Sequence, residues 1–511
     1  MSARGGVTRG TGACAFVAGQ LKDQAYLAKE LFFDARFRAP LISIWVATGG
    51  GALHDPVTTF YYLKLGVTSA QLGEIQAIAF CAALFLSPLY GWFLDTRGSY
   101  YPLLASCFLC GLGCLIRCIA PNVNWLYAGA LVLGLGGGNL WTVTLTHLSV
   151  YAEESRRNVI VGAFTFQVTT LRILGKAAYP AWNFFVQDIL GVEEELLRYR
   201  IHMSTCTFMC FFGFFWMWLF DGQAIYNLKP RTSAAAARND VDGEKKALVE
   251  GEKDSSRAAK DESFHAKESF LKKKAFIILC VCLFIQSAST AAINTLWPLF
   301  VREWFHFGPT EFSYLLLSST VFSAGSIACI AGLGEKYGNR VLLVSTMVVS
   351  LVGTTVAFQI RSRLWPLIIL HTIFATVFFA SCNSMGPLIK GMTTFVVPAS
   401  YAGRIFAILS IATGLGSIGA NLSATRLYSM KSNKFGMAPQ TLTFVSVSAV
   451  LFCGVLLACL LPRKKTESSG RSHEMRERTA NWLKEKQSPP ISDNDSQSED
   501  DHIPGKRVYL N

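Results

Sequence analysis

Two short polar turns decide the fold of this chain. The first reads Gly91-Trp-Phe-Leu-Asp95-Thr-Arg97-Gly98, and the second reads Ala331-Gly-Leu-Gly-Glu335-Lys336-Tyr-Gly338-Asn-Arg340. Each turn lies between two long apolar stretches, and the two turns lie about half a chain apart. A carboxylate, a cation and a glycine recur in both, which indicates a duplicated helical fold in a membrane.

The composition also places the chain in a lipid bilayer. Of its 511 residues, 51% are hydrophobic and only 16% are charged, whereas soluble proteins carry roughly 25% charged residues. A helix needs about 20 apolar residues to cross a bilayer, and the sequence holds many such stretches without the alternation of a β-barrel. We therefore predict an all-α polytopic membrane protein.

The apolar stretches and turn signals predict twelve transmembrane helices in two six-helix bundles. The expected helices are 39–63, 71–94, 101–120, 125–150, 159–188, 201–221, 274–300, 312–333, 341–360, 364–389, 404–427 and 441–461. The bundles then cover 39–222 and 274–461. Residues 223–273 and 462–511 are polar and charged, which predicts a disordered linker and tail, and 1–38 is expected to be an N-terminal tail.

The net charge of +13 does not indicate a nucleic-acid partner, because the cations cluster in connecting segments and tails. This distribution is expected of cytoplasmic loops, so both termini are predicted to be cytoplasmic. The choice between the plasma membrane and an internal membrane stays open. We expect a monomer that contacts the lipid bilayer and a small-molecule solute, without a cofactor or a catalytic set of residues.

The cysteines allow two interpretations. Most of the 14 lie in apolar stretches, and Cys107, Cys110, Cys114 and Cys118 form a stripe on one expected helix. Such spacing is compatible with soft metal ligands, but cysteine is also a small residue that is readily buried. We predict no metal site.

The two turns and the twelve-helix layout resemble the major facilitator superfamily over about residues 38–461. Gly91, Asp95 and Gly98 match the family's loop signature between its second and third helices, and Arg97 lies one place from its usual position. The second turn keeps a corresponding set, namely Glu335, Lys336, Gly338 and Arg340. The resemblance implies transport by alternating access, with these two turns as gating elements.

Ionisable residues deep in a bilayer are costly and usually functional. Asp55, preceded by His54, lies in the first expected helix, and Arg172 and Lys176 share one face of the fifth. An ion pair of Asp55 with Lys176 or Arg172 is geometrically possible, which would leave one cation for an anionic solute; the alternative is a static salt bridge that orders the first half. Arg172 is the better anion ligand because its planar guanidinium grips a carboxylate with two bonds.

Polar residues of the second half complete the predicted solute site. These are Gln286, Asn294 and Asn383, although ordinary interhelical hydrogen bonds would explain them equally well. The expected function is secondary active transport of a small organic anion, with proton coupling through Asp55. The alternative is a receptor or scaffold that has the fold of a transporter but does not transport.

Overall fold

The computed structural model describes residues 29, 31–151, 157–226, 255–396, 402–430 and 438–461. These residues form helices joined by short turns, and no strand occurs among them. The helices of the first half are α2 (Ala35–Lys64), α3 (Ser69–Arg97), α4 (Tyr100–Cys118), α5 (Val123–Tyr151), α6 (Arg157–Phe184), η1 (Phe185–Ile189), α7 (Glu195–Trp216), η2 (Met217–Asp221) and α8 (Gly222–Tyr226). The helices of the second half are α10 (Ser255–Phe305), α11 (Pro309–Tyr337), α12 (Asn339–Ala357), α13 (Trp365–Val396), α14 (Ala402–Tyr428) and α15 (Pro439–Cys459).

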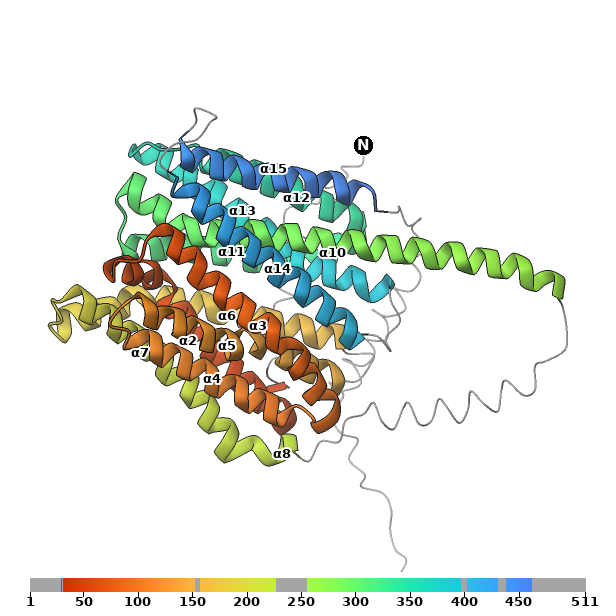
Figure 1. Cartoon of the computed structure of the whole chain (residues 1–511), viewed down its shortest axis with the longest axis horizontal. Coiled ribbons are helices and arrows are strands. Elements are labelled where there is room, and N and C mark those ends of the chain that lie inside the picture. Colours follow the sequence, from red (N-terminus) through yellow and green to blue (C-terminus); the bar gives the residue numbers. More distant parts are fainter. Residues whose placement is uncertain are drawn as a thin grey trace, which may run out of the picture. The chain divides into compact units, whose positions relative to one another are not determined.

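Each expected transmembrane helix has a counterpart in this set, six in each half of the described chain (Figure 1). Ten helices of the described residues are long and apolar enough to cross a membrane. The other two long helices are α2 and α6, which carry Asp55 and the pair Arg172 and Lys176 respectively. Polar side chains in otherwise apolar helices therefore lower the apolarity of the two helices that hold the predicted charges.

One helix boundary differs from the prediction. We expected this helix to begin at residue 274, after a linker that is at most partly helical, whereas α10 begins at Ser255. Residues 255–273 are rich in Ala, Lys and Glu, which have high helix propensity. They also continue directly into a long apolar helix, so extending that helix requires no separate nucleation step. The remainder of the expected linker from residue 227 onward, most of the N-terminal tail and residues 462–511 lie outside the described residues.

Duplication is visible in the geometry of the second and third helices of each half. α3 and α11 both have 29 residues, and α4 and α12 both have 19. Both α3 and α11 start with a capping hydrogen bond, in which the backbone N–H of Thr68 donates to Gln71 Oε1 and that of Gly308 donates to Glu311 Oε2. The two halves therefore repeat one structural plan.

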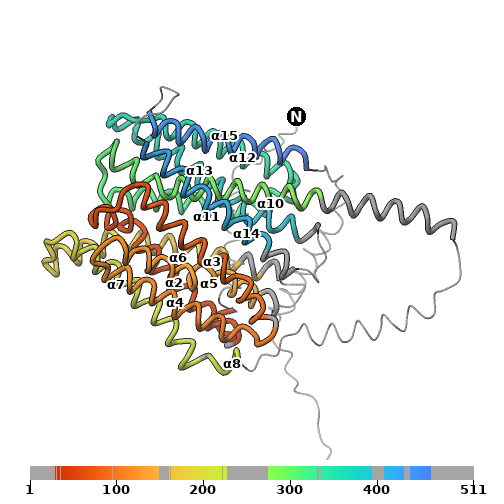
Figure 2. The backbone as a smooth tube through the Cα atoms, in the orientation of Figure 1, coloured from red at the N-terminus to blue at the C-terminus, as the bar shows by residue number. Residues whose placement is uncertain are grey.

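The halves meet along two seams, α3 against α14 and α6 against α11. In each seam, the second long helix of one half contacts the fifth long helix of the other half. The two seams are therefore equivalent under the symmetry that relates the two halves. This reciprocity is expected of two related domains around a pseudo-twofold axis. Figure 2 shows the first half in red to yellow beside the second half in green to blue.

We name the two ends of the bundle by their connections. The linker end holds α8 and the C-terminal ends of α3 and α11, whereas the far end holds the turns that join α2 to α3, η1 to α7 and α10 to α11 (Figure 1). Helices of both halves run between these ends.

The second half contains a buried polar contact amid aromatic rings. His371 is fully buried; its Nε2 accepts a 3.0 Å hydrogen bond from Trp297 Nε1, and its Nδ1 donates to the carbonyl oxygen of Ala357 at 2.8 Å. The ring of Phe300 stacks on it, with centroids 5.3 Å apart. Because the carbonyl only accepts, the hydrogen of the neutral ring lies on Nδ1.

We expect His371→Phe to lower the unfolding free energy by about 1–3 kcal/mol, because it leaves the buried Trp297 N–H and the Ala357 carbonyl without a hydrogen-bond partner. Thermal unfolding in detergent, followed by tryptophan fluorescence, measures the change. The double variant with Trp297→Phe should recover part of the loss, since it removes the stranded donor. Equal melting temperatures for wild type and His371→Phe would contradict this account.

Candidate functional site

The predicted charges of α2 and α6 face the interior of the bundle. On α6, Leu174 is 58% exposed and marks an apolar outward face. At 100° per residue, Arg172 and Lys176 both lie about 200° from Leu174, on the opposite face. Arg172 is nevertheless exposed, so its guanidinium lies in open space inside the bundle.

Lys176 forms a hydrogen bond that joins the two halves. Its Nζ donates a 2.9 Å hydrogen bond to Thr320 Oγ1 of α11. Asp55 and Arg172 are the charged groups whose electrostatic effect reaches this ammonium. Lys176 therefore sits at the α6–α11 seam, where movement of one half against the other would make or break its bond.

The ion pair of Asp55 that the sequence allows is not formed in this conformation, although the charge of Asp55 acts on Lys176. Asp55 is exposed on α2 and forms no ion pair or hydrogen bond to Arg172 or Lys176 within the described ranges. Lys176 has Thr320 as its partner instead, since the α6–α11 seam brings that hydroxyl within reach. Preceding Asp55, His54 is buried, and its Nδ1 donates to the carbonyl of Gly50 at 3.1 Å within the same helix.

A polar stripe of α10 supplies the second half's side of the interior. Gln286, Thr290 and Asn294 recur every four residues and lie on the side away from the exposed apolar side chains Val281 and Phe284. Gln286 Nε2 donates to Thr290 Oγ1 at 3.3 Å. Asn294 is exposed between fully or largely buried neighbours. Its amide is thus available to a ligand.

Lys176 and Asn383 bind neighbouring hydroxyl groups of α11. Asn383 Nδ2 of α13 donates to Ser323 Oγ at 3.1 Å. Ser323 lies one helical turn from Thr320, the partner of Lys176, which is about 4.5 Å along the axis of α11. The two side chains from opposite halves therefore contact the same helix one turn apart.

Three of these residues escaped the sequence analysis. Thr320 and Ser323 belong to the hydroxyl-rich run 318–326 of α11, and that run is the signal that would have found them. Lys390 follows Asn383 by two turns on the same face of α13. It is half-buried and has no hydrogen-bond or ion-pair partner within the described chain. Arg172 was identified as an ionisable residue within a membrane helix, and the same criterion identifies Lys390, which the sequence analysis overlooked.

The two halves are closed against each other at the far end. Arg426 of α14 lies 3.5 Å from Glu74 of α3, and Glu74 also accepts a 2.8 Å hydrogen bond from Tyr127. Next to Glu74 in the chain and in the same seam, Gly73 touches α14 so closely that a Cβ atom there would lie 2.0 Å from Thr425 Oγ1. Only glycine permits this approach.

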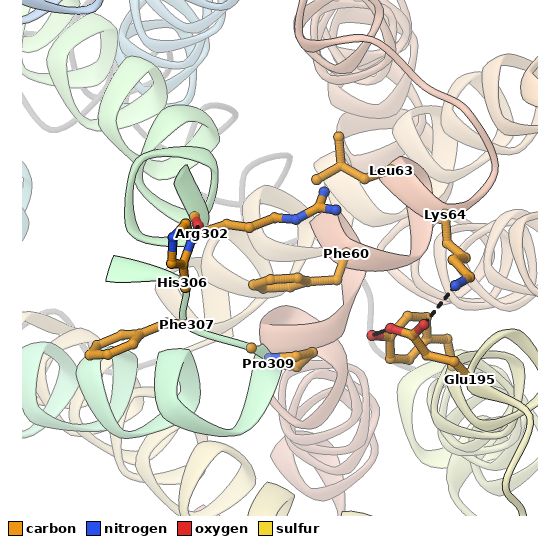
Figure 3. A pocket seen from close by; sticks show the side chains of 10 residues that line it. Phe60, Leu63, Lys64, Glu195, Arg302, His306, Phe307 and Pro309 are labelled. Atoms are coloured by element: carbon orange, nitrogen blue, oxygen red, sulfur yellow. Dashed lines mark hydrogen bonds and ion pairs between the residues drawn. The ribbon is translucent and has the colours of Figure 1, made fainter. Parts of the chain in front are cut away.

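A charged pocket of about 440 Å³ opens beside this closure. Figure 3 shows Arg302 reaching from α10 toward Phe60 of α2, with Lys64 and Glu195 on the other wall. Lys64 Nζ donates to Glu195 Oε2 at 2.7 Å. This pocket, from here on the far-end pocket, contains both signs of charge, and its arginine has room to move.

The two predicted gating turns both end in a glycine with positive φ. α3 ends at Gly98 with φ +81°, and α11 ends at Gly338 with φ +86°. Residues other than glycine rarely adopt such φ values. Both glycines were predicted, and the similar φ angles extend the duplication to the turns themselves.

Neighbouring residues anchor these turns. Ser99 contacts His147 Nδ1 of α5 at 2.5 Å, and Arg340 donates to the carbonyl of Cys459 at the end of α15. Among the other predicted gating residues, Gly91 is half-buried and Arg97 is exposed. The side chains of Asp95, Glu335 and Lys336 lie outside the described part of the chain.

Comparison with known families settles what the duplicated architecture represents. The sequence profile of the Major Facilitator Superfamily matches residues 41–284 and matches again over 279–492. The chain belongs to this superfamily. Both halves match separately, as the repeated helices and turns require, and the members of the superfamily that this chain resembles are transporters rather than enzymes.

Individual members of the superfamily are similar over part or all of the fold. Vacuolar basic amino acid transporter 1 of Saccharomyces cerevisiae is 27% identical over 152 residues, which is 29% of this chain and 26% of the yeast protein. Monocarboxylate transporter 9 of Rattus norvegicus is 27% identical over 133 residues, 26% of this chain and 25% of that protein. This chain therefore spans about a quarter of the length of these relatives.

The solved structure of the nucleoside transporter NupG shares the fold. It superposes with a TM-score of 0.57 over 85% of this chain and 100% of NupG, at 12% sequence identity. At this identity the likeness concerns the fold alone. The family match and the ten long apolar helices of the described residues indicate an integral, multi-pass membrane protein.

Proposed function

We propose that the protein is a secondary active transporter of a small organic anion. One observation carries this proposal, namely the excess of positive charge over the single carboxylate Asp55 on these helices. Arg172 and Lys176 share one face of α6, the charge of Asp55 acts on Lys176, and Lys390 adds a half-buried cation on α13. Uncompensated cations in a membrane interior are costly, and an anionic solute would lower that cost.

Arg172 is the primary anion ligand in this proposal. It has no hydrogen-bond or ion-pair partner within the described residues and lies on the interior face of α6. Its guanidinium therefore keeps its hydrogen-bond donors for a carboxylate, which it binds with two parallel bonds. Lys176, Asn294 and Asn383 supply further donors around the solute.

The names of the relatives offer two solute classes with opposite charge. One relative is named for basic amino acids and another for monocarboxylates. A basic amino acid requires carboxylates to receive its cationic side chain, whereas this interior has more cations than carboxylates. The excess of interior cations in this chain therefore favours a solute that carries a carboxylate.

The contacts between the halves support alternating access. The Glu74–Arg426 pair and the close approach at Gly73 seal the far end. With the linker end in the cytoplasm, as the basic connecting segments favour, this conformation faces inward. Rocking of the halves about a central site would separate Lys176 from Thr320 and open the far-end pocket.

Asp55 is the proposed proton site, because an exposed interior carboxylate without a cationic partner can exchange a proton as the cavity changes sides. Replacing Asp55 by Asn should abolish uptake driven by a pH gradient, while exchange of solute for solute continues. Uptake into proteoliposomes with and without a gradient measures both. Wild-type gradient dependence in Asp55→Asn would exclude Asp55 as the coupling group.

A ligand screen by thermal unfolding tests the solute class. Purified protein is heated with organic anions, sugars, basic amino acids, nucleosides or cationic drugs, because a ligand of the folded state raises the apparent melting temperature. We expect stabilisation by carboxylates that disappears in Arg172→Ala. Stabilisation by neutral or cationic compounds alone would make Arg172 and Lys176 structural residues.

A further inference from the structure

A cluster of four cysteines joins α4 to α7 away from the solute site. Cys110 and Cys114 lie four residues apart on α4, and Cys206 and Cys210 lie four residues apart on α7. Since α4 and α7 are antiparallel, Cys110 lies next to Cys210 and Cys114 lies next to Cys206. The Sγ–Sγ distances are 3.6 Å and 3.8 Å respectively.

The spacing of these sulfur atoms suits a metal ion. The Sγ atoms of Cys110, Cys114 and Cys210 all lie within 4.8 Å of one another, and Cys206 is in contact with Cys114. A metal–sulfur bond of about 2.3 Å in a tetrahedral site requires sulfur atoms about 3.8 Å apart. The observed distances therefore need only small side-chain adjustments.

The surroundings of the cluster are largely apolar and closed to solvent. All four thiols are free and at most 7% exposed, and the partly buried apolar side chains packed against them are Ala47 and Leu133. Neighbouring glycines press the helices together, since a Cβ atom at Gly137 would lie 3.2 Å from Cys110 Sγ. A thiolate site here would be dry, closed and supplied wholly by the protein, as structural metal sites are.

A buried arginine supplies the charge that such a site needs. Arg117 is only 6% exposed, and its Nε has no hydrogen-bond partner. It lies one turn from Cys114 on α4, and its charge acts on Cys114 and Cys206. No carboxylate pairs with it within the described helices. The guanidinium lies over the ring of Tyr62, with 5.3 Å between its Cζ and the ring centroid, and thiolates at Cys114 and Cys206 would supply the negative charge that it lacks.

We propose that this cluster binds a soft d10 metal ion, Zn²⁺ or Cu⁺, as a structural staple between α4 and α7. Soft thiolate ligands select these ions. Zn²⁺ with three thiolates, or Cu⁺ with two, carries one negative charge, which Arg117 balances. Each metal–sulfur bond replaces a sulfur–hydrogen bond, and the proton leaves to water, so no electron transfer is involved.

Metal titration of the full chain tests the proposal. Reduced protein in detergent is stripped with a chelator and titrated with Co²⁺ as a spectroscopic probe of tetrahedral thiolates. Separate titrations with Zn²⁺ and with Cu⁺ against a chromophoric competitor identify the ion. We expect one ion per chain for at least one of the two, an intense sulfur-to-cobalt charge-transfer band, and a metal-dependent rise in melting temperature.

Single substitutions separate this site from the other cysteines. Cys110→Ser and Cys210→Ser should lose the charge-transfer band and stoichiometric binding. Cys107→Ser, at a buried position three residues before Cys110 but outside the cluster, should retain both. Arg117→Gln should keep the stoichiometry but weaken binding by about 10- to 100-fold, as for other groups around metal ligands.

Two results would overturn the proposal. One is the failure of reduced wild-type protein to bind Zn²⁺ or Cu⁺ stoichiometrically. The other is equal binding by the wild type and both cluster variants, which would assign the ion to other residues. Size-exclusion elution and solute-dependent melting of each variant establish that it is folded.

Discussion

Arg172→Gln is expected to reduce solute uptake by about 100-fold or more at low solute concentration. The substitution keeps a polar side chain but removes the charge and the two-pronged donor. Each hydrogen bond to a charged group is worth roughly 1.5–3 kcal/mol, so the loss of two amounts to at least a hundredfold. Uptake of a radiolabelled carboxylate into proteoliposomes measures the change, with protein per liposome determined in parallel.

Two variants sharpen this prediction. Arg172→Lys retains the charge without the planar fork, and it should fall between wild type and Arg172→Gln. Arg363→Gln is the matched control, because Arg363 lies in the short connection between α12 and α13 and contacts His306 there. Uptake by Arg172→Gln equal to that of Arg363→Gln would remove Arg172 from the solute site.

Gly73→Val is expected to prevent closure of the far end. The first added carbon would lie 2.0 Å from Thr425 Oγ1 and 2.3 Å from the Asn421 carbonyl oxygen. Overpacking of this kind costs typically 1–3 kcal/mol or more, and the cost falls only on the conformation in which α3 meets α14. Transport should therefore drop by about tenfold or more, with the far end held open.

Accessibility of the far-end pocket reports this change. A cysteine placed at Phe60, which lines the pocket, should react faster with an impermeant maleimide in Gly73→Val than in the Gly73 background. Gly419→Val is the control, since a Cβ atom at that position of α14 has no neighbour within 4 Å. Slower or unchanged labelling together with normal transport would show that the α3–α14 seam does not gate access.

The sequence predicted the fold well because its signals are local. Twenty apolar residues, a turn glycine and a helix cap act over one or two turns of chain, so the long helices and the paired glycines Gly98 and Gly338 were all readable. The start of α10 at Ser255 was missed because its polar first turns resemble a linker in composition. Only their continuity with an apolar helix makes them helical.

The site was predicted less completely because its partners come from distant segments. Arg172 and Lys176 were recognisable as costly charges, but 144 residues separate Lys176 from its partner Thr320. No local pattern identifies which hydroxyl on which helix faces a given lysine. For the same reason, the stripe of cysteines on α4 was readable, whereas Cys206 and Cys210 on α7 acquire meaning only through packing.

Flux through wild-type protein in proteoliposomes tests the central claim most directly. Liposomes with and without an inward proton gradient are offered labelled monocarboxylates, basic amino acids and nucleosides at equal concentration. Our account predicts saturable, gradient-stimulated uptake of a carboxylate that unlabelled carboxylates suppress and basic amino acids do not. Uptake of cationic or neutral solutes alone would contradict the anion site, and binding of a carboxylate without any flux would contradict transport itself.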